Sequence, residues 1–215
     1  MKGRSLPLKN AKLLRRAFFN RDPRIVSRHL LGKLIVRKEG RKRLVGRIVE
    51  VEAYLGADDA AAHAAAGRTA RNEVLFGPPG YAYVYFIYGV HYCLNISCLP
   101  EDVAGCVLIR ALEPVQGIEE MTEARGLSKD FNPVHNLRAL TSGPGKLCQA
   151  LQITRTRDNG KDMLSSSSDL VVMDDGYRAK KICTTPRIGI TKSAAMPLRY
   201  LLAENHFVSR SRTST

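Results

Sequence analysis

Residues 49–54 alternate strictly between small apolar side chains and the larger side chains Glu50, Glu52 and Tyr54. Successive side chains of a β-strand point to opposite faces, so this pattern predicts a strand with two carboxylates and a phenol on one face. A sheet that buried this face would have to pair both carboxylates, because an isolated buried carboxylate is costly. The segment therefore predicts either a site of chemistry or, as for most carboxylates, a solvent-exposed outer face.

Five of the eight tyrosines lie between positions 81 and 92, and the chain has no tryptophan. Gly89 separates two predicted strands, Tyr81–Tyr88 and Val90–Ser97, because glycine tolerates the positive φ angles of tight turns. We therefore predict a β-hairpin with Tyr88 near its tip. Tyrosine fits any pleated sheet well, so ordinary β-propensity is the simpler explanation of the crowding alone.

Length and composition fit a single domain. The 215 residues are 44% hydrophobic, which fills a sizeable core, and no linker or repeat divides them. No apolar run reaches membrane-spanning length and the first residues are charged, so we expect an intracellular, monomeric protein that is neither secreted nor membrane-bound. The five cysteines form no C-x-x-C pair, and phosphate-binding glycine motifs are absent. We expect no disulfide framework, no metal and no cofactor.

The positive charge is concentrated near the N-terminus. Residues 1–47 hold 16 lysines and arginines but only two acidic residues, so the whole net charge of +14 falls in this segment. Such a distribution is typical of a surface that binds a polyanion, although a solvated basic tail is the alternative. We expect a basic arm over residues 1–22, one folded domain over residues 23–208 and a frayed tail over residues 209–215.

Local signals place helices and strands in no regular βαβ order. Asp22 and Pro23 predict the cap and first residue of a helix that ends at Gly32. Further helices are predicted at 58–64, at 115–125 and after 143. Strands are predicted at 33–38, 44–54, 103–112, 170–173 and 182–190, and we expect the last two to pair with each other. We therefore expect a single mixed α+β domain with a curved antiparallel sheet and surrounding helices.

Arg110 interrupts the apolar strand predicted at 103–112. A charged side chain in such a strand needs a partner, and the carboxylate of Glu52 is a candidate.

Several motifs occur in one order along nearly the whole chain. They are Gly46–Gly56, Ala61–His63, Tyr83–Tyr85, Ile87–Gly89, Asn95–Ser97, Cys106–Pro114 and Ser142–Leu151. In these segments the chain resembles the alkyladenine (3-methyladenine) DNA glycosylase family, from about Pro23 to Tyr200.

The resemblance implies a base excision repair enzyme that acts on damaged double-stranded DNA. Such enzymes flip alkylated or deaminated purines, of the 3-methyladenine, 7-methylguanine, hypoxanthine and ethenoadenine class, and hydrolyse the N-glycosidic bond. Glu52 matches the acid that activates water, and Arg110 matches the arginine beside it. No lysine falls at a nucleophile position, so a monofunctional enzyme that leaves an abasic site is expected.

The resemblance also implies where the base is held. Tyr54 matches one wall of the base pocket, and His63 and Tyr85 match the other. Asn95 matches the asparagine that crowds the amino group of normal guanine. Tyr88 matches the tyrosine that wedges into the minor groove, so the predicted hairpin should protrude and fill the gap in the duplex.

Two segments are candidates for phosphate contacts. Arg68 and Arg71 lie in a polar connection that the resemblance covers. Ser142, Gly143 and Lys146 start a predicted helix, where free backbone N–H groups and a lysine can bind an anion, although helices commonly begin this way.

Two other functions explain parts of the sequence. A noncatalytic nucleic-acid-binding module would explain the basic segment and the tyrosines but leaves Glu52 and Arg110 without a role. A sugar hydrolase using Glu50 and Glu52 as acid and base leaves the basic segment unexplained. Carboxylates two residues apart on one strand also flank a glycosidic bond poorly.

Overall fold

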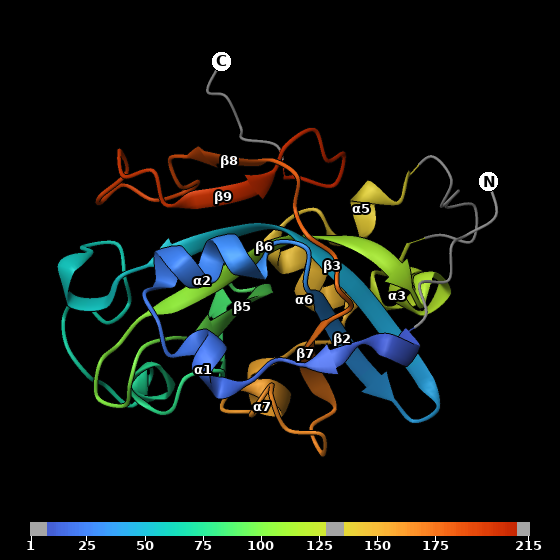
Figure 1. The fold of residues 1–215 in the computed structure, drawn as a ribbon, viewed down its shortest axis with the longest axis horizontal. Helices are drawn as coiled ribbons and strands as arrows, with labels where there is room; N and C mark the ends of the chain where they lie inside the picture. Colours follow the sequence, from blue (N-terminus) through green and yellow to red (C-terminus); the bar gives the residue numbers. More distant parts are fainter. Residues whose placement is uncertain (1–7, 128–135, 210–215) are drawn as a thin grey trace.

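The longest strand, β3 (Lys42–Tyr54), lies at the centre of the sheet in the computed structural model (Figure 1), which describes residues 8–127 and 136–209. It pairs antiparallel with three strands: β2 (Leu34–Glu39), β6 (Cys106–Gln116) and β9 (Arg199–Leu202). A strand of this length can bend around a core while different parts of it pair with different neighbours. β3 therefore links all parts of the sheet.

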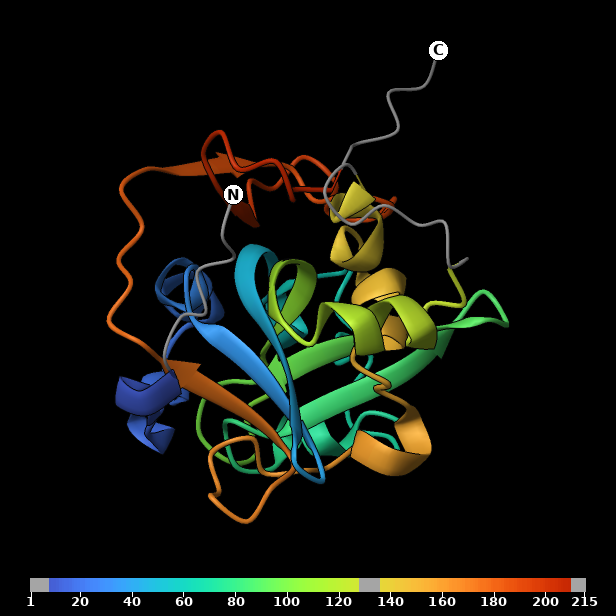
Figure 2. The same ribbon diagram turned by 90° about the vertical axis from the view of Figure 1, so that its right-hand side faces the viewer.

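The remaining strands extend the sheet on both sides of β3. Beyond β6 lie β5 (His91–Ser97) and β4 (Ala82–Ile87), and beyond β2 lie β7 (Leu170–Asp174) and β1 (Lys12–Leu13). β8 (Ile182–Thr185) pairs with β9, and all pairings are antiparallel. The sheet curls into a half-barrel, with β8 and β9 along one side and the β4–β5 hairpin extending from another (Figures 1 and 2). The predicted mixed α+β fold with a curved antiparallel sheet is confirmed.

Helices fill and cover the half-barrel. α2 (Pro23–Leu30) begins as predicted: the Asp22 carboxylate accepts a hydrogen bond from the Arg24 N–H at 2.7 Å, and Pro23 is the first helical residue. The other helices of the described residues are η1 (Leu8–Asn10), α1 (Arg16–Phe19), η2 (Gly56–Asp58), η3 (Glu73–Phe76), α3 (Ile118–Ala124), α5 (Arg138–Thr141), α6 (Pro144–Ala150) and α7 (Arg155–Asp158).

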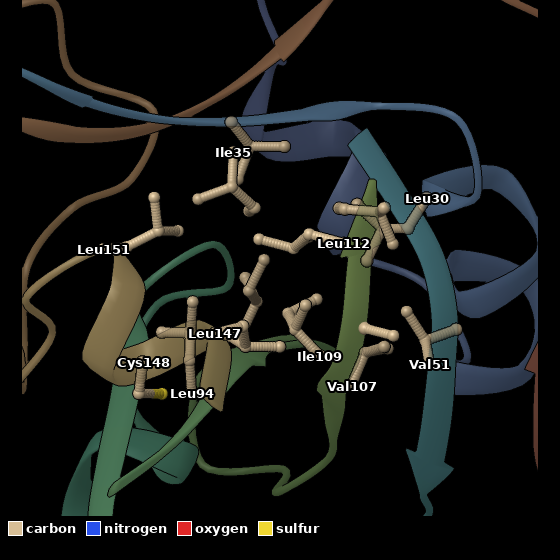
Figure 3. Packing of buried hydrophobic residues seen from close by; sticks show 14 of the residues in the cluster. Leu30, Ile35, Val51, Leu94, Val107, Ile109, Leu112, Leu147, Cys148 and Leu151 are labelled. Carbon is tan, nitrogen blue, oxygen red and sulfur yellow. The ribbon is translucent and has the colours of Figure 1, made fainter. Parts of the chain in front are cut away.

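The hydrophobic core lies inside the curl of the sheet. Leu30 of α2 and Leu147 of α6 gather there with Val51, Ile109 and Leu112 of the central strands (Figure 3). The apolar face of β3 is thus fully buried in one core. Burial of such side chains stabilises the fold by about 1.5–3 kcal/mol each.

The opposite face of β3 is also buried. Glu50 and Glu52 are both 0% exposed, so the solvent-exposed outer face is ruled out. The register between β3 and β6 shifts on both sides of Glu50, leaving Val49 and Arg110 without a paired residue. Such bulges re-aim side chains, and here Arg110 faces both carboxylates.

Two helix predictions need correction. The helix predicted at 58–64 is wrong, since one 3₁₀ turn, η2, is followed by irregular turns. The reason is that Asp59 accepts hydrogen bonds from the Leu55 and Ala61 N–H groups and pairs with Arg187, which holds a loop. The helix predicted at 115–125 starts only at Ile118, because β6 continues to Gln116.

The predicted pairing of the last two strands is also wrong. β7 pairs with β1 and β2, whereas β8 pairs with β9. Leu170, Val171 and Val172 are all buried, so β7 belongs beside the buried strand β2 rather than in a peripheral hairpin.

The basic N-terminal segment is partly integrated in the fold. Phe19 is fully buried in the main core, and β1 lies at the sheet edge. Basic residues of this segment pair with acids from 158–175, namely Arg16–Asp162, Lys33–Asp174, Arg37–Asp158 and Arg47–Asp175. These four basic side chains are therefore paired with acids that lie far along the chain. Contact of residues 1–22 with DNA stays a prediction, and residues 1–7 lie outside the described residues.

Candidate active site

A cavity of about 410 Å³ lies between the end of β3, the β4–β5 hairpin and β6. Aromatic rings make up much of its wall, contributed by Tyr54, His63, Tyr83, Tyr85, Phe86 and Tyr88. Its volume falls within the range of about 300–1,000 Å³ typical of small-molecule sites. The cavity can take a flat, aromatic ligand.

Glu52 lies directly behind the wall of this cavity. Its Oε1 accepts a hydrogen bond from the Ile188 N–H at 2.8 Å and lies 3.2 Å from an Nη1 of Arg110. Its Oε2 accepts a hydrogen bond from the Tyr54 hydroxyl at 3.1 Å. All three partners line the cavity, while Glu52 is fully buried. Since a carboxylate has about four acceptor positions, three donors leave room for a water molecule.

Glu50 has a different environment from Glu52. It accepts hydrogen bonds from the Nε–H groups of Arg110 and Arg199 at 2.9 and 2.7 Å. It also accepts hydrogen bonds from the N–H and the hydroxyl of Ser209 at 2.6 and 2.7 Å. Four donors fill its acceptor positions, so Glu50 is a structural anchor. Ser209, which we placed in the frayed tail, is held by these bonds.

Arg110 joins the two carboxylates. Burial opposes its charge, but Glu52 and Glu50 outweigh that penalty and raise the pKa of Arg110 above its ordinary value. The predicted pairing of Arg110 with a carboxylate is confirmed, with both carboxylates as partners.

His63 and Tyr85 form one aromatic corner of the cavity. Their ring centres are 4.4 Å apart with the planes inclined by 67°, and His63 Nδ1 lies 2.9 Å from the Tyr83 hydroxyl. Burial, helped by the Arg71 charge, lowers the pKa of His63, and burial raises the pKa of Tyr83 to about 12. The corner is therefore uncharged at neutral pH.

Asn95 lies on the cavity wall in a fixed orientation. Its Nδ2 donates to the Tyr83 carbonyl at 3.2 Å, and its Oδ1 lies 3.8 Å from the thiol of Cys106. Asn95 is 3% exposed, so its amide is a fixed part of this wall.

Tyr88 stands at the rim of the cavity on the β4–β5 turn. It has a φ of 53° and is 79% exposed, and the following residues Gly89 and Val90 complete the turn. Gly89 has a φ of 68°, which confirms the need for glycine there. The predicted hairpin with Tyr88 near its tip is confirmed, although its insertion into DNA stays a prediction.

The candidate phosphate residues divide into three places. Ser142, Gly143 and Lys146 line a second cavity of about 530 Å³ that shares Arg110 with the first. Arg71 lines the first cavity, and Arg68 is paired with Asp102 at 2.5 Å. Apart from Arg68 and Glu52, the predicted site residues all line one of two cavities that share Arg110, and Glu52 lies directly behind the wall of the first.

The cysteines, possible metal ligands and helix lengths bear on disulfides, metal binding and membrane insertion. All five cysteines are free thiols. Over residues 8–127 and 136–209, no group of three or more His, Cys, Asp or Glu side chains could hold a metal ion. In the same residues no helix is long and apolar enough to span a bilayer.

Comparison with known proteins identifies the family. Residues 17–206 match the family described as Methylpurine-DNA glycosylase (MPG). The chain belongs to this family. It is a DNA glycosylase, an enzyme that hydrolyses N-glycosidic bonds and removes alkylated purines during DNA repair.

Three similar proteins carry the name "Putative 3-methyladenine DNA glycosylase". The protein from Koribacter versatilis (strain Ellin345) is 64% identical over 199 residues, which cover 93% of this chain and 94% of the relative. That from Alkaliphilus oremlandii (strain OhILAs) is 45% identical over 206 residues, covering 92% and 98%. That from Clostridium botulinum (strain Hall) is 45% identical over 202 residues, covering 91% and 98%.

Sequence reasoning missed three residues that contact the candidate site of this methylpurine-DNA glycosylase. Ile188 donates its N–H to Glu52, Arg187 pairs with Asp59 behind Tyr54, and Arg199 binds Glu50. Arg187 and Ile188 fall in a stretch read only as part of a strand. The available signal was that Arg187 is the one charged residue of that predicted strand, 182–190, and a buried charge needs a partner.

Proposed function

We propose that this enzyme is a monofunctional glycosylase that flips alkylated or deaminated purines from duplex DNA and hydrolyses their N-glycosidic bonds. The substrates include 3-methyladenine, which the names of the similar proteins specify, together with 7-methylguanine, hypoxanthine and ethenoadenine. The supporting observation is that Glu52 lies one side chain behind an aromatic cavity large enough for a purine.

Glu52 and Arg110 are the catalytic residues of this proposal. The carboxylate of Glu52 activates a water molecule and stabilises the electron-poor sugar that forms as the base departs. Arg110 and the Ile188 N–H hold the carboxylate, and both residues line the cavity, so the carboxylate is fixed directly behind its wall. No lysine is among the residues that line this cavity in the described part of the chain, which favours water over an amine as the nucleophile.

The aromatic residues bind the flipped base. Tyr54 stacks on one side, and His63 and Tyr85 lie on the other. Stacking is worth about 1–3 kcal/mol per base, which offsets part of the few kcal/mol that base flipping costs. Asn95 obstructs the amino group of normal guanine.

Excision from defined oligonucleotides tests this proposal. A labelled duplex with one hypoxanthine or 3-methyladenine is incubated with the enzyme and treated with alkali. We expect strand cleavage at the lesion only after alkali, because an abasic site is alkali-labile. Intact strands would contradict the enzymatic proposal, and cleavage without alkali would show a lyase. The noncatalytic module and the sugar hydrolase both predict intact strands.

Tyr88→Ala is expected to lower excision from duplex DNA by about 5- to 150-fold, the equivalent of one lost stacking interaction. Excision from a single-stranded oligonucleotide should change little, since that strand has no gap to fill. Single-turnover rates on both substrates provide the measurement. Tyr177→Ala, at another exposed tyrosine that lines neither cavity, is the control. Equal losses on the two substrates would argue against a wedge.

Lys146→Ala is expected to weaken binding to all duplexes alike and to lower the salt dependence by about 0.9 log unit, the effect of one phosphate contact. The reason is that Lys146 is exposed at the mouth of the second cavity, beside Ser142. Titrations at several salt concentrations measure the slope. Lys42→Ala, which removes an exposed lysine paired with Glu120, should leave the slope unchanged. An unchanged slope for Lys146→Ala would remove this residue from the DNA interface.

A further inference from the structure

Arg187 forms a buried clamp beside the active site. Its two terminal nitrogens lie 2.5 and 2.8 Å from the carboxylate of Asp59, and both side chains are fully buried. The guanidinium also donates to the carbonyl of Ala53 at 3.0 Å. The pair therefore fastens the loop after β3 to the segment after β8, although 128 positions separate the two residues.

The same guanidinium covers the Tyr54 ring. Its central carbon lies 4.5 Å from the ring centre. Tyr54 lines the base cavity, whereas Arg187 is buried and does not. The guanidinium therefore contacts the ring face that is turned away from the cavity. The next residue, Ile188, donates its N–H to Glu52.

A cation on one face of a ring affects what can stack on the other. The negative potential of the ring face attracts cations, and a positive charge already bound to that ring opposes a second one. A purine alkylated at N3 or N7 carries a positive charge in DNA, whereas hypoxanthine is neutral. Asp59 offsets part of the Arg187 charge. The charged residues that line the cavity are Arg71 and Arg110, and in the described part of the chain no carboxylate lines it. Glu50 and Glu52, behind the wall, offset the Arg110 charge, so Arg71 and Arg187 are the cations that act on the bound base.

We propose that Arg187 is a positioning residue that fixes Tyr54 and the Ile188 amide, and that its charge favours a neutral flipped base over a cationic one at the binding step. This inference rests on the proposed function of the cavity. The Arg187 charge would make the Tyr54 wall selective for neutral bases, which the shape of the wall alone does not do.

Arg187→Met in a Glu52→Gln background tests the inference, because lesion duplexes are then bound without being cleaved. Dissociation constants are measured by fluorescence anisotropy for hypoxanthine and for 7-methylguanine, each opposite cytosine. We expect the preference for hypoxanthine over 7-methylguanine to fall by about fivefold on loss of the charge. Arg187→Lys keeps a charge and should retain most of the preference, even where both affinities fall.

Two controls separate this effect from misfolding. The double variant Arg187→Met and Asp59→Asn removes the unpaired carboxylate and is used if the single variant is unfolded by thermal melting. Arg28 also lies over a tyrosine ring, with its guanidinium carbon 4.8 Å from the ring centre of Tyr200. Arg28→Met should leave the preference for hypoxanthine over 7-methylguanine unchanged.

The inference is overturned if the folded variant loses affinity for both duplexes by the same factor. That result would leave Arg187 a purely structural residue. Failure of the proposed function is distinguishable, because the unmodified enzyme would then leave both lesion bases in place.

Discussion

Glu52→Gln is expected to lower the single-turnover rate of base excision by about a thousandfold, because the amide cannot take a proton from water or stabilise a positive sugar. Binding of lesion DNA should persist, since Glu52 does not line the cavity. Excision of 3-methyladenine or hypoxanthine from a labelled duplex, with enzyme in excess, gives the rate. Gel-shift titration of the same duplex gives the affinity.

Glu50→Gln is the matched control for this prediction. Glu50 lies two residues away on the same strand, is equally buried and also contacts Arg110. Its four donors make it an anchor, so its replacement should destabilise the protein and slow excision much less than Glu52→Gln. Equal loss of rate in the two variants, with both folded, would show that Glu52 has been wrongly chosen.

Arg37→Leu is expected to lower the free energy of unfolding by about 3 kcal/mol, because it leaves the buried Asp158 carboxylate with Lys161 as its one remaining cationic partner in the described residues. The Arg37 side chain is 0% exposed and lies 2.7 Å from the equally buried Asp158 and 3.1 Å from Asp169. Its Nε also donates to the Leu151 carbonyl at 3.2 Å. Urea-induced unfolding measures the change, which is a large part of a typical stability of about 5–15 kcal/mol.

An exposed ion pair provides the comparison. Arg24 pairs with Asp22 at 2.5 Å, and its side chain is 57% exposed. Arg24→Leu should cost less than about 1 kcal/mol, because solvent screens such pairs. A loss for Arg37→Leu no larger than that for Arg24→Leu would mean that Lys161, 2.9 Å from Asp158, compensates for the missing guanidinium.

Local patterns predicted the elements on which the site is built. The alternation in residues 49–54 predicted β3, and Gly89 predicted the turn that carries Tyr88. The lone charge of Arg110 in an apolar strand predicted its ion pair with a carboxylate. These predictions were correct because each depends on side-chain periodicity or on one residue with a strong conformational or electrostatic requirement.

Long-range contacts account for what local patterns missed. The alanine-rich stretch 58–64 has high helix propensity, but the Asp59–Arg187 pair fixes it as a loop. The alternation places Glu50 and Glu52 on one face and cannot distinguish them. Their donors distinguish them, and Arg199 and Ser209 lie far along the chain from Glu50.

The bonds from Arg199 and Ser209 to Glu50 constrain when the enzyme can acquire its native state during protein synthesis. These donors follow Glu50 by 149 and 159 positions. At about 5–20 residues per second, a ribosome needs roughly 8 to 30 s to deliver them. Until then the central strand carries a carboxylate without its full set of partners. We therefore expect the nascent chain to complete the site around Arg110 only after Ser209 has left the ribosome.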